Sequence, residues 1–430
     1  MDQGNTGFIL ISSALVLLMT PGLAFFYGGM VKAKSVVSMM MLSFGSMGLV
    51  GVLWVVYGYS VSFSSSDSKT FVGIPGWFGW DPANFFLNSQ VSNALDMNAN
   101  APDFAAGAHP SLAFVAFQAT FAIITVALIS GAIADRAKFG AWMIFAAVWA
   151  TVVYFPVADW VFNFGSDGTG TGANGGWLVQ LGVIDFAGGT AVHINAGAAG
   201  LALAIVLGKR FGFSKGITQP HNVPLTLLGA GLLWFGWFGF NAGSALQANG
   251  HAAVAFINTL SAPAAAMLGW LIVEKFKHGK ATSIGAASGA VAGLVAITPA
   301  CDILDPGWGL LLGLLAGALC ALAIDLKFAL GFDDSLDVVG IHLVGGIFGT
   351  LYIGIFGRGV GAAFGEGWAQ LGKQAIGAGS VLVYSFVIAF IIGFIIEKTV
   401  GFRVKAEDEI AGIDTVVHGE EAYAFGGANV

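Results

Sequence analysis

The stretches AGGTAVHINAGAAGLALAIVL (187–207) and DVVGIHLVGGIFGTLYIGIFG (337–357) decide the fold of this 430-residue chain. Both are apolar runs long enough to cross a membrane as a helix. Both also carry one histidine in the pattern H-x3-G-x2-G. An ionisable side chain at membrane depth is costly, so it usually faces a cavity or a transport path. His193 and His342 are therefore the first candidates for a functional site.

The composition is that of a polytopic membrane protein. Hydrophobic residues make up 57% of the chain and charged residues 10%, whereas about a quarter of residues are charged in soluble domains. Runs of roughly 20 apolar residues span a hydrocarbon core of about 30 Å. Eleven such runs occur, at approximately 7–31, 36–63, 111–133, 139–162, 186–208, 223–243, 251–274, 281–300, 306–328, 337–357 and 376–400. We therefore predict an all-α polytopic membrane protein with eleven transmembrane helices.

Basic residues predict the orientation, because lysine and arginine concentrate on the cytoplasmic side. With the N-terminus outside, fourteen of the 17 basic residues fall in inner loops or the tail, and three fall outside. This distribution predicts an N-out, C-in topology. The net charge of −7 argues against nucleic acid as a partner.

The histidine motif lies on the fifth helix of each of two five-helix units, at about 7–208 and about 223–357. Five is an odd number, so the second unit is inverted relative to the first. Inverted repeats commonly place a transport site near the midplane, between the two units. We expect a transmembrane domain over 1–402, with a last helix at about 376–400, and a cytoplasmic tail over 403–430.

Carboxylates precede both histidines. Asp185 and Asp337 stand at the starts of their helices, where a carboxylate can cap the helix and favour the positive end of its dipole. We expect capping for Asp337. For Asp185 the choice between capping and attraction of a cation on the outer side stays open.

The chemistry of the predicted path favours a small polar molecule that can become neutral. The sequence offers neither a carbonyl filter nor a ring of acidic side chains for a bare ion. Aromatic faces attract ammonium groups, and Phe117, Phe121, Trp237 and Phe240 are candidates. The histidines come with no nucleophile, metal-ligand cluster or phosphate-binding loop, so we predict neither an enzyme nor a cofactor.

Five segments together resemble one family, the Amt/Mep/Rh ammonium transporters, on its bacterial Amt branch. They are PGLAFFYGG (21–29), AFQATFAIITVALISGAIADR (116–136), DFAGGTAVHINAGAAG (185–200), GWFGFNAGSA (236–245) and DVVGIHLVGGIFG (337–349). The resemblance implies a homotrimer of eleven-helix subunits, each with its own pore.

The resemblance also implies roles for individual residues. His193 and His342 match the twin pore histidines, and Phe121 and Phe240 match the phenylalanine gate. Ser244 matches a serine that hydrogen-bonds ammonium at the outer site. The pore-wall and acidic positions of the family correspond to Phe117, Trp237 and Asp185.

One position departs from the family pattern. The fourth helix of the family commonly ends in a stretch resembling Y-x-P-x-A-H-x-x-W, and this chain reads YFPVADWVF (154–162). Phe162 stands in place of the tryptophan, and a phenylalanine face is the weaker cation-π partner. Either the external affinity is lower, or Trp160 substitutes for the missing ring.

The tail segment EDEIAGIDTVVHGEEAY (407–423) resembles the family's cytoplasmic tail, which docks on neighbouring subunits and supports binding of a PII-type nitrogen regulatory protein. The matching positions are Gly412, Asp414, His418, Gly419, Glu420 and Tyr423. A solvated, loosely ordered tail is the alternative.

We predict an ammonium transporter of the inner (plasma) membrane that recruits the cation outside, deprotonates it and conducts ammonia, with methylammonium as an analogue. Two alternatives stay open. One is an ammonium sensor with little flux, and the other is a neutral gas channel of the Rh type.

Overall fold

The computed structural model describes residues 2–95, 110–165, 175–213 and 219–423. The last part of the predicted tail, 424–430, lies outside the described residues. Within these ranges, eleven helical segments are long and apolar enough to cross a membrane. This result confirms the prediction of an all-α polytopic membrane protein.

Four of the eleven spans are single helices, and the other seven consist of two or more helical pieces. The first five are α1 (Gln3–Met30), α2 (Val36–Leu53) with α3 (Tyr59–Phe63), α5 (Ser111–Ile129), α6 (Phe139–Trp149) with α7 (Phe155–Phe162), and the π-helical turn Gly189–Ile194 with α9 (Asn195–Leu207). The others are α10 (Val223–Gly243), α11 (Gly250–His278), α12 (Ser283–Ile297), α13 (Pro306–Ala323) with α14 (Leu326–Leu330), the π-helical turn Val339–Leu343 with α15 (Val344–Phe356), and α16 (Ala369–Thr399). Between and after the spans lie the hairpin of β1 (Val72–Ile74) and β2 (Phe78–Trp80), the short helices α4 (Asn88–Leu95), α8 (Trp177–Leu181) and α17 (Ala406–Ala411), and the short helical turns Pro82–Leu87, Ala362–Phe364 and Asp414–His418.

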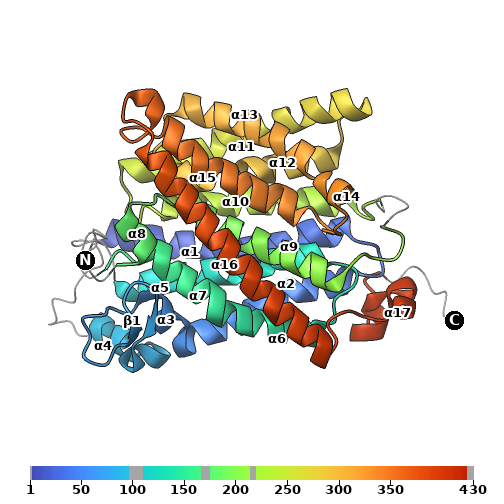
Figure 1. Cartoon of the computed structure of the whole chain (residues 1–430), viewed down its shortest axis with the longest axis horizontal. Coiled ribbons are helices and arrows are strands. Elements are labelled where there is room, and N and C mark those ends of the chain that lie inside the picture. Colours follow the sequence, from blue (N-terminus) through green and yellow to red (C-terminus); the bar gives the residue numbers. More distant parts are fainter. Residues whose placement is uncertain (1, 96–109, 166–174, 214–218, 424–430) are drawn as a thin grey trace.

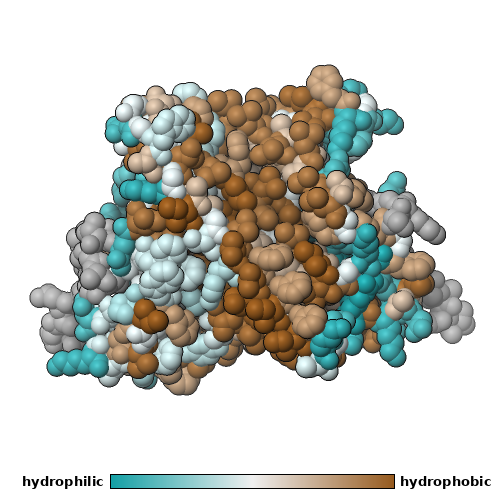
Figure 2. Space-filling view, in the orientation of Figure 1, coloured by the Kyte–Doolittle hydropathy of each residue, from teal (hydrophilic) through white to brown (hydrophobic). Residues whose placement is uncertain are grey.

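The helices lie side by side between two ends of the molecule (Figure 1). We call the end with α8 and β1 the N-face, and the end with α17 the C-face. Helix α16 crosses the bundle diagonally in this view. Figure 2 shows a broad hydrophobic band across the middle, with more polar residues at both ends. This is the pattern expected of a protein that sits in a bilayer.

Glycine allows helix backbones to come unusually close. A Cβ atom on Gly229 of α10 would lie 2.2 Å from the backbone nitrogen of Phe26 on α1. A Cβ atom on Gly317 of α13 would lie 1.9 Å from the carbonyl oxygen of Ala266 on α11. Neither contact leaves room for a side chain, so the glycine content supports the dense packing that membrane helices need.

The two histidine-bearing spans are antiparallel. The turn before α9 contacts α15, and the turn before α15 contacts α9. The α9 span begins at the N-face, while the α15 span begins at the C-face. His193 and His342 therefore approach the interior from opposite ends. The inverted-repeat relation and the N-out orientation remain predictions.

Candidate functional site

A carboxylate fixes the first histidine turn. The chain reaches Gly189 through Gly188, whose φ of +114° suits glycine. The Asp185 carboxylate then accepts hydrogen bonds from the backbone N–H groups of residues 188, 189, 190 and 191 at 2.8, 2.6, 2.8 and 3.1 Å. It also accepts one from the Thr190 hydroxyl. These donors have no partner within the helix, so Asp185 acts as its cap. Asp185 lines none of the three cavities described below.

Asp334 does the same for the second histidine turn. Its carboxylate accepts from the backbone N–H groups of Val338 at 3.1 Å and Val339 at 2.7 Å. Burial, followed by the nearby charge of Asp337, raises the pKa of the Asp334 carboxyl. Asp334 precedes His342 by eight residues, the same spacing as Asp185 to His193. This D-x7-H repeat was readable from the sequence.

The prediction that Asp337 caps its helix is wrong. Its backbone has a φ of +63°, and its side chain pairs with the Lys327 ammonium at 2.5 Å. The same ammonium donates to the carbonyl oxygen of Asp334 at 3.2 Å. Asp337 thus neutralises a buried lysine, while Asp334 supplies the cap.

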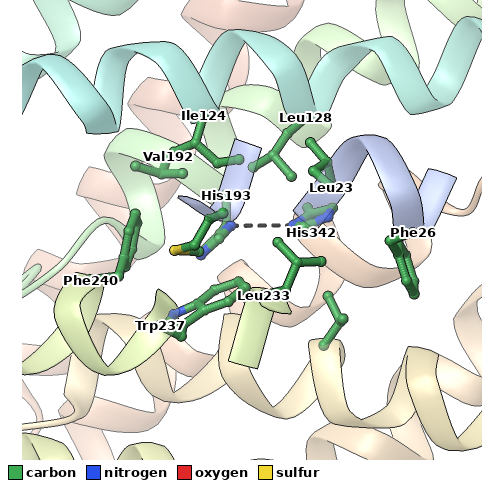
Figure 3. Close-up of a pocket in the computed structure, with 12 residues that line it drawn as sticks. Leu23, Phe26, Ile124, Leu128, Val192, His193, Leu233, Trp237, Phe240 and His342 are labelled. Carbon is green, nitrogen blue, oxygen red and sulfur yellow. Dashed lines mark hydrogen bonds between the residues drawn. The ribbon is translucent and has the colours of Figure 1, made fainter. Parts of the chain in front are cut away.

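The two imidazoles meet in the interior. Their Nδ1 atoms are 3.3 Å apart, and the rings lie 5.3 Å apart at 22° (Figure 3). His193 is 1% exposed and His342 is 3% exposed. In a neutral pair, one Nδ1 donates to the other, so one Nε2 carries a proton and the other is a free acceptor. The pair therefore offers one donor and one acceptor beyond its mutual hydrogen bond.

The cavity around the pair, here called the histidine cavity, is narrow and apolar. Its volume is about 10 Å³, at the lower limit for one water molecule. The ring of Trp237 stacks on His193 at 5.4 Å and 22°, and its N–H donates to the Thr298 hydroxyl at 2.8 Å. Besides His193, His342 and Trp237, the lining comprises Met19, Leu23, Phe26, Ile124, Leu128, Val192, Leu233, Phe240 and Val291.

Two phenylalanines close the N-face side of the histidine cavity. The rings of Phe121 and Phe240 are stacked, 4.1 Å apart at 13°. Phe240 lines the histidine cavity, whereas Phe121 lines a second cavity toward the N-face. The stacked pair therefore lies between the two cavities.

The N-face cavity has a volume of about 30 Å³, enough for a water-sized guest. Ser244 lies in its wall and donates its hydroxyl proton to the carbonyl oxygen of Phe240 at 2.8 Å. Its nine lining residues are Phe114, Phe117, Gln118, Phe121, Phe162, Phe164, Phe186, Ser244 and Leu246. Gln118 was not predicted, because a single glutamine in an apolar run gives no periodic signal.

The structure does not bring Trp160 to this cavity. Its N–H donates to the carbonyl oxygen of Trp77 at 2.6 Å. Its ring packs against Trp77, Trp177 and Tyr384, with centroids 6.0, 5.7 and 4.8 Å away. Phe162 does line the cavity, with its ring edge-on to Phe121 at 6.2 Å and 84°.

A larger cavity of about 290 Å³ opens at the C-face side. Met30 and Ser288 line it one turn beyond Phe26 and Val291 of the histidine cavity. Its charged lining residues are Arg210, Glu274 and the paired Lys327 and Asp337. Arg210 pairs with the carboxylates of Asp135 and Asp333 at 3.1 and 2.9 Å. The three cavities follow one another from face to face.

The described part of the tail docks on the C-face of its own chain. The Asp414 carboxylate accepts from the backbone N–H groups of Ser38 at 2.7 Å and Val37 at 3.0 Å, at the start of α2. The His418 ring contacts Phe139 at 5.5 Å, and the Tyr423 hydroxyl bonds His221 Nε2 at 2.9 Å. Gly412 and Gly419 have φ values of +128° and +69°, and Glu420 is exposed.

Comparisons with known proteins agree with this architecture. Residues 7–423 match the model of the Ammonium Transporter Family. An ammonium transporter of Mycobacterium tuberculosis is 55% identical over 99% of this chain and 91% of its own length. An ammonium transporter of Bacillus subtilis is 42% identical over 98% of this chain and 99% of its own length.

Solved structures agree as well. The crystal structure of Candida albicans Mep2 superposes with a TM-score of 0.83 at 32% identity, covering 95% of this chain and 88% of that one. A structure named "Sensor Amt Protein" gives a TM-score of 0.83 at 28% identity, covering 96% and 98%. This chain belongs to the ammonium transporter family.

Proposed function

We propose that this chain removes a proton from ammonium at the N-face side and conducts the guest across the membrane as neutral ammonia. One observation carries the proposal. Two imidazoles share a hydrogen bond between their Nδ1 atoms, inside a cavity of about 10 Å³ whose other lining residues are apolar apart from the indole of Trp237. Such a space suits a small neutral molecule that can donate and accept hydrogen bonds.

The energetics favour ammonia over ammonium in this space. Moving an ammonium-sized ion from water into a medium of low dielectric constant costs on the order of 20 kcal/mol in the idealised limit, and several kcal/mol after relaxation. Removing its proton near neutral pH costs only roughly 3 to 5 kcal/mol, for an amine pKa near that of lysine. Deprotonation therefore competes with desolvation before the guest passes Phe121 and Phe240.

The histidine pair then assists passage without a charged intermediate. The protonated Nε2 of the pair can donate to the ammonia lone pair, and the unprotonated Nε2 can accept one of its N–H groups. Beyond His342, the C-face cavity returns the guest to water. Reprotonation is expected there, next to the charged pair of Lys327 and Asp337.

The wider assembly is part of the same proposal. The N-face lies outside the cell and the C-face in the cytoplasm, as the basic residues predict. The transporter domain, 1–402, forms a homotrimer in the inner (plasma) membrane, with one path in each subunit. The tail, 403–430, is the regulatory segment on which a PII-type protein acts.

Flux in proteoliposomes tests the proposal directly. An ammonium gradient is applied while current and internal pH are recorded together, against vesicles without protein. The His193→Ala/His342→Ala double variant should lose flux or its selectivity for ammonium. His251→Gln is the matched control, because His251 pairs with Asp302 at the N-face end of α11, outside the path.

Each outcome has a distinct meaning. Protein-dependent flux with inward current means net charge movement, and a pH change without current means conduction of neutral ammonia alone. Ammonium binding without flux would overturn the transporter proposal in favour of a sensor. Unchanged, ammonium-selective flux in the double variant would remove the histidines from the path.

A further inference from the structure

The N-face cavity is lined by the side-chain amide of Gln118, whose oxygen has no hydrogen-bond partner among the described residues. Seven of its nine lining side chains are hydrocarbon, namely six phenylalanines and Leu246. The other two, Gln118 and Ser244, supply its polar side-chain atoms. A desolvated cation entering this cavity has to replace lost water contacts with these atoms or with aromatic faces.

Ser244 can serve only as an acceptor. Its hydroxyl proton is already donated to the carbonyl oxygen of Phe240 at 2.8 Å. The oxygen keeps a lone pair, so Ser244 can accept one hydrogen bond from a guest. A single acceptor leaves most of the four N–H groups of ammonium unsatisfied.

Gln118 supplies a second acceptor. The residue is 6% exposed, and its side-chain oxygen has no hydrogen-bond partner among the described residues. A buried acceptor without a partner is costly, and native structures rarely keep one without a reason. A half-turn of the amide exchanges its oxygen and nitrogen, and a cation selects the orientation that presents the oxygen.

The local geometry makes such an acceptor more important here. Gln118 lies on α5 one turn from both Phe114 and Phe121, on the same wall of the cavity. Phe162 stands where a stronger aromatic cation partner is common in the family, and its ring is edge-on to Phe121. Hydrogen-bond acceptors therefore have to supply more of the interaction with the cation.

We infer that Gln118 is a direct ligand of ammonium in the N-face cavity, where its side-chain carbonyl oxygen accepts an N–H group together with the hydroxyl oxygen of Ser244. The inference rests on the proposed function and adds an affinity-determining residue to it. Each of the two oxygens can accept an N–H group of ammonium or methylammonium. Gln118 thereby raises the affinity of the cavity for these guests.

The test is the ammonium dependence of the initial flux rate in proteoliposomes for Gln118→Leu. A hydrogen bond to a charged group is worth enough to raise the half-saturating ammonium concentration about 10- to 100-fold. The maximal rate should change much less, because the histidine cavity is untouched. Thr120→Val is the matched control, because Thr120 is buried on the same helix, lies outside the cavity lining and bonds only its own helix at Phe117.

Several results would overturn the inference. An unchanged half-saturating concentration in Gln118→Leu shows that the amide is not a ligand. A lower maximal rate at constant half-saturation assigns it a structural role instead.

If Gln118→Leu does not fold, Gln118→Glu retains the oxygen and adds charge. The half-saturating concentration of Gln118→Glu should fall as the new carboxyl ionises, and a pH-independent value would count against a ligand. Absence of wild-type flux would instead overturn the proposed function.

Discussion

At the residue scale, the ring of Phe162 influences how strongly the aromatic lining of the N-face cavity attracts a cation. Its ring lies in the cavity wall, edge-on to Phe121. A tryptophan face attracts cations more strongly than phenylalanine, within a range of about 0.5 to 2 kcal/mol for such contacts. We expect Phe162→Trp to lower the half-saturating ammonium concentration by about two- to tenfold, as measured by initial flux rates.

Trp160→Phe provides the comparison for this prediction. Trp160 packs with Trp77, Trp177 and Tyr384 outside the cavity, so its replacement should leave the half-saturating concentration unchanged. A weaker apparent affinity in Trp160→Phe, with no gain in Phe162→Trp, would show that Trp160 substitutes for the family tryptophan.

The sequence could place some of these residues in the path and not others. His193 and His342 stand out because a histidine in an apolar run is rare and each lies in the same short motif. Gln118 is different, because a polar residue in a helix can face a cavity or a neighbouring helix, and only the three-dimensional packing decides which. The side-chain direction of Trp160, two residues from Phe162, is likewise a matter of packing.

At the scale of elements, the helix positions were predictable and the local turns were not. Apolar run length predicted the span 36–63, and the structure has it at Val36–Phe63. The π-helical turns that carry both histidines have no composition of their own, since they arise where a wider turn fits the packing. The sequence indicated the cap at Asp334, because Asp334 precedes its histidine by the same eight residues as Asp185 does. It gave no indication of the positive φ of Asp337.

The two capping carboxylates should differ in strength. Asp185 satisfies four backbone N–H groups and a hydroxyl, whereas Asp334 satisfies two backbone N–H groups. Each buried donor left unpaired costs about 1 to 3 kcal/mol. We therefore expect Asp185→Ala to lower the thermal unfolding temperature in detergent more than Asp334→Ala does.

Asparagine variants refine this comparison. Each keeps one oxygen acceptor, so Asp185→Asn and Asp334→Asn should fall between wild type and the alanine variants. An equal or reversed order of the two alanine variants would contradict the idea that stability follows the number of satisfied donors.

At the scale of the whole molecule, the tail links the start of α2 to the rest of the C-face. Ser35, the residue before α2, makes no capping bond with its own side chain. Asp414 provides that cap from more than 370 residues along the chain. Docking of the tail therefore stabilises a helix start that the local sequence leaves without a side-chain cap. Through this contact the tail can influence a helix that is distant in the sequence.

This docking should depend on pH. Burial raises the pKa of the Asp414 carboxyl when it is docked, and the hydrogen bonds from Ser38 and Val37 offset only part of that effect. A group that binds its proton more tightly in the docked state favours docking at low pH. Docking should therefore be strongest below the undocked pKa of about 3.9. It should weaken as pH rises toward the docked pKa and then level off.

Hydrogen exchange over residues 406–418, corrected for intrinsic rates, measures this dependence, with greater protection expected at the acidic end. Asp414→Asn keeps an oxygen acceptor and cannot ionise, so its protection should vary less with pH. His418 and Lys34 also face this segment, and His418→Gln controls for the titration of that imidazole. If the slope persists in Asp414→Asn and disappears in His418→Gln, the histidine is the sensing group and the carboxylate serves only as a cap.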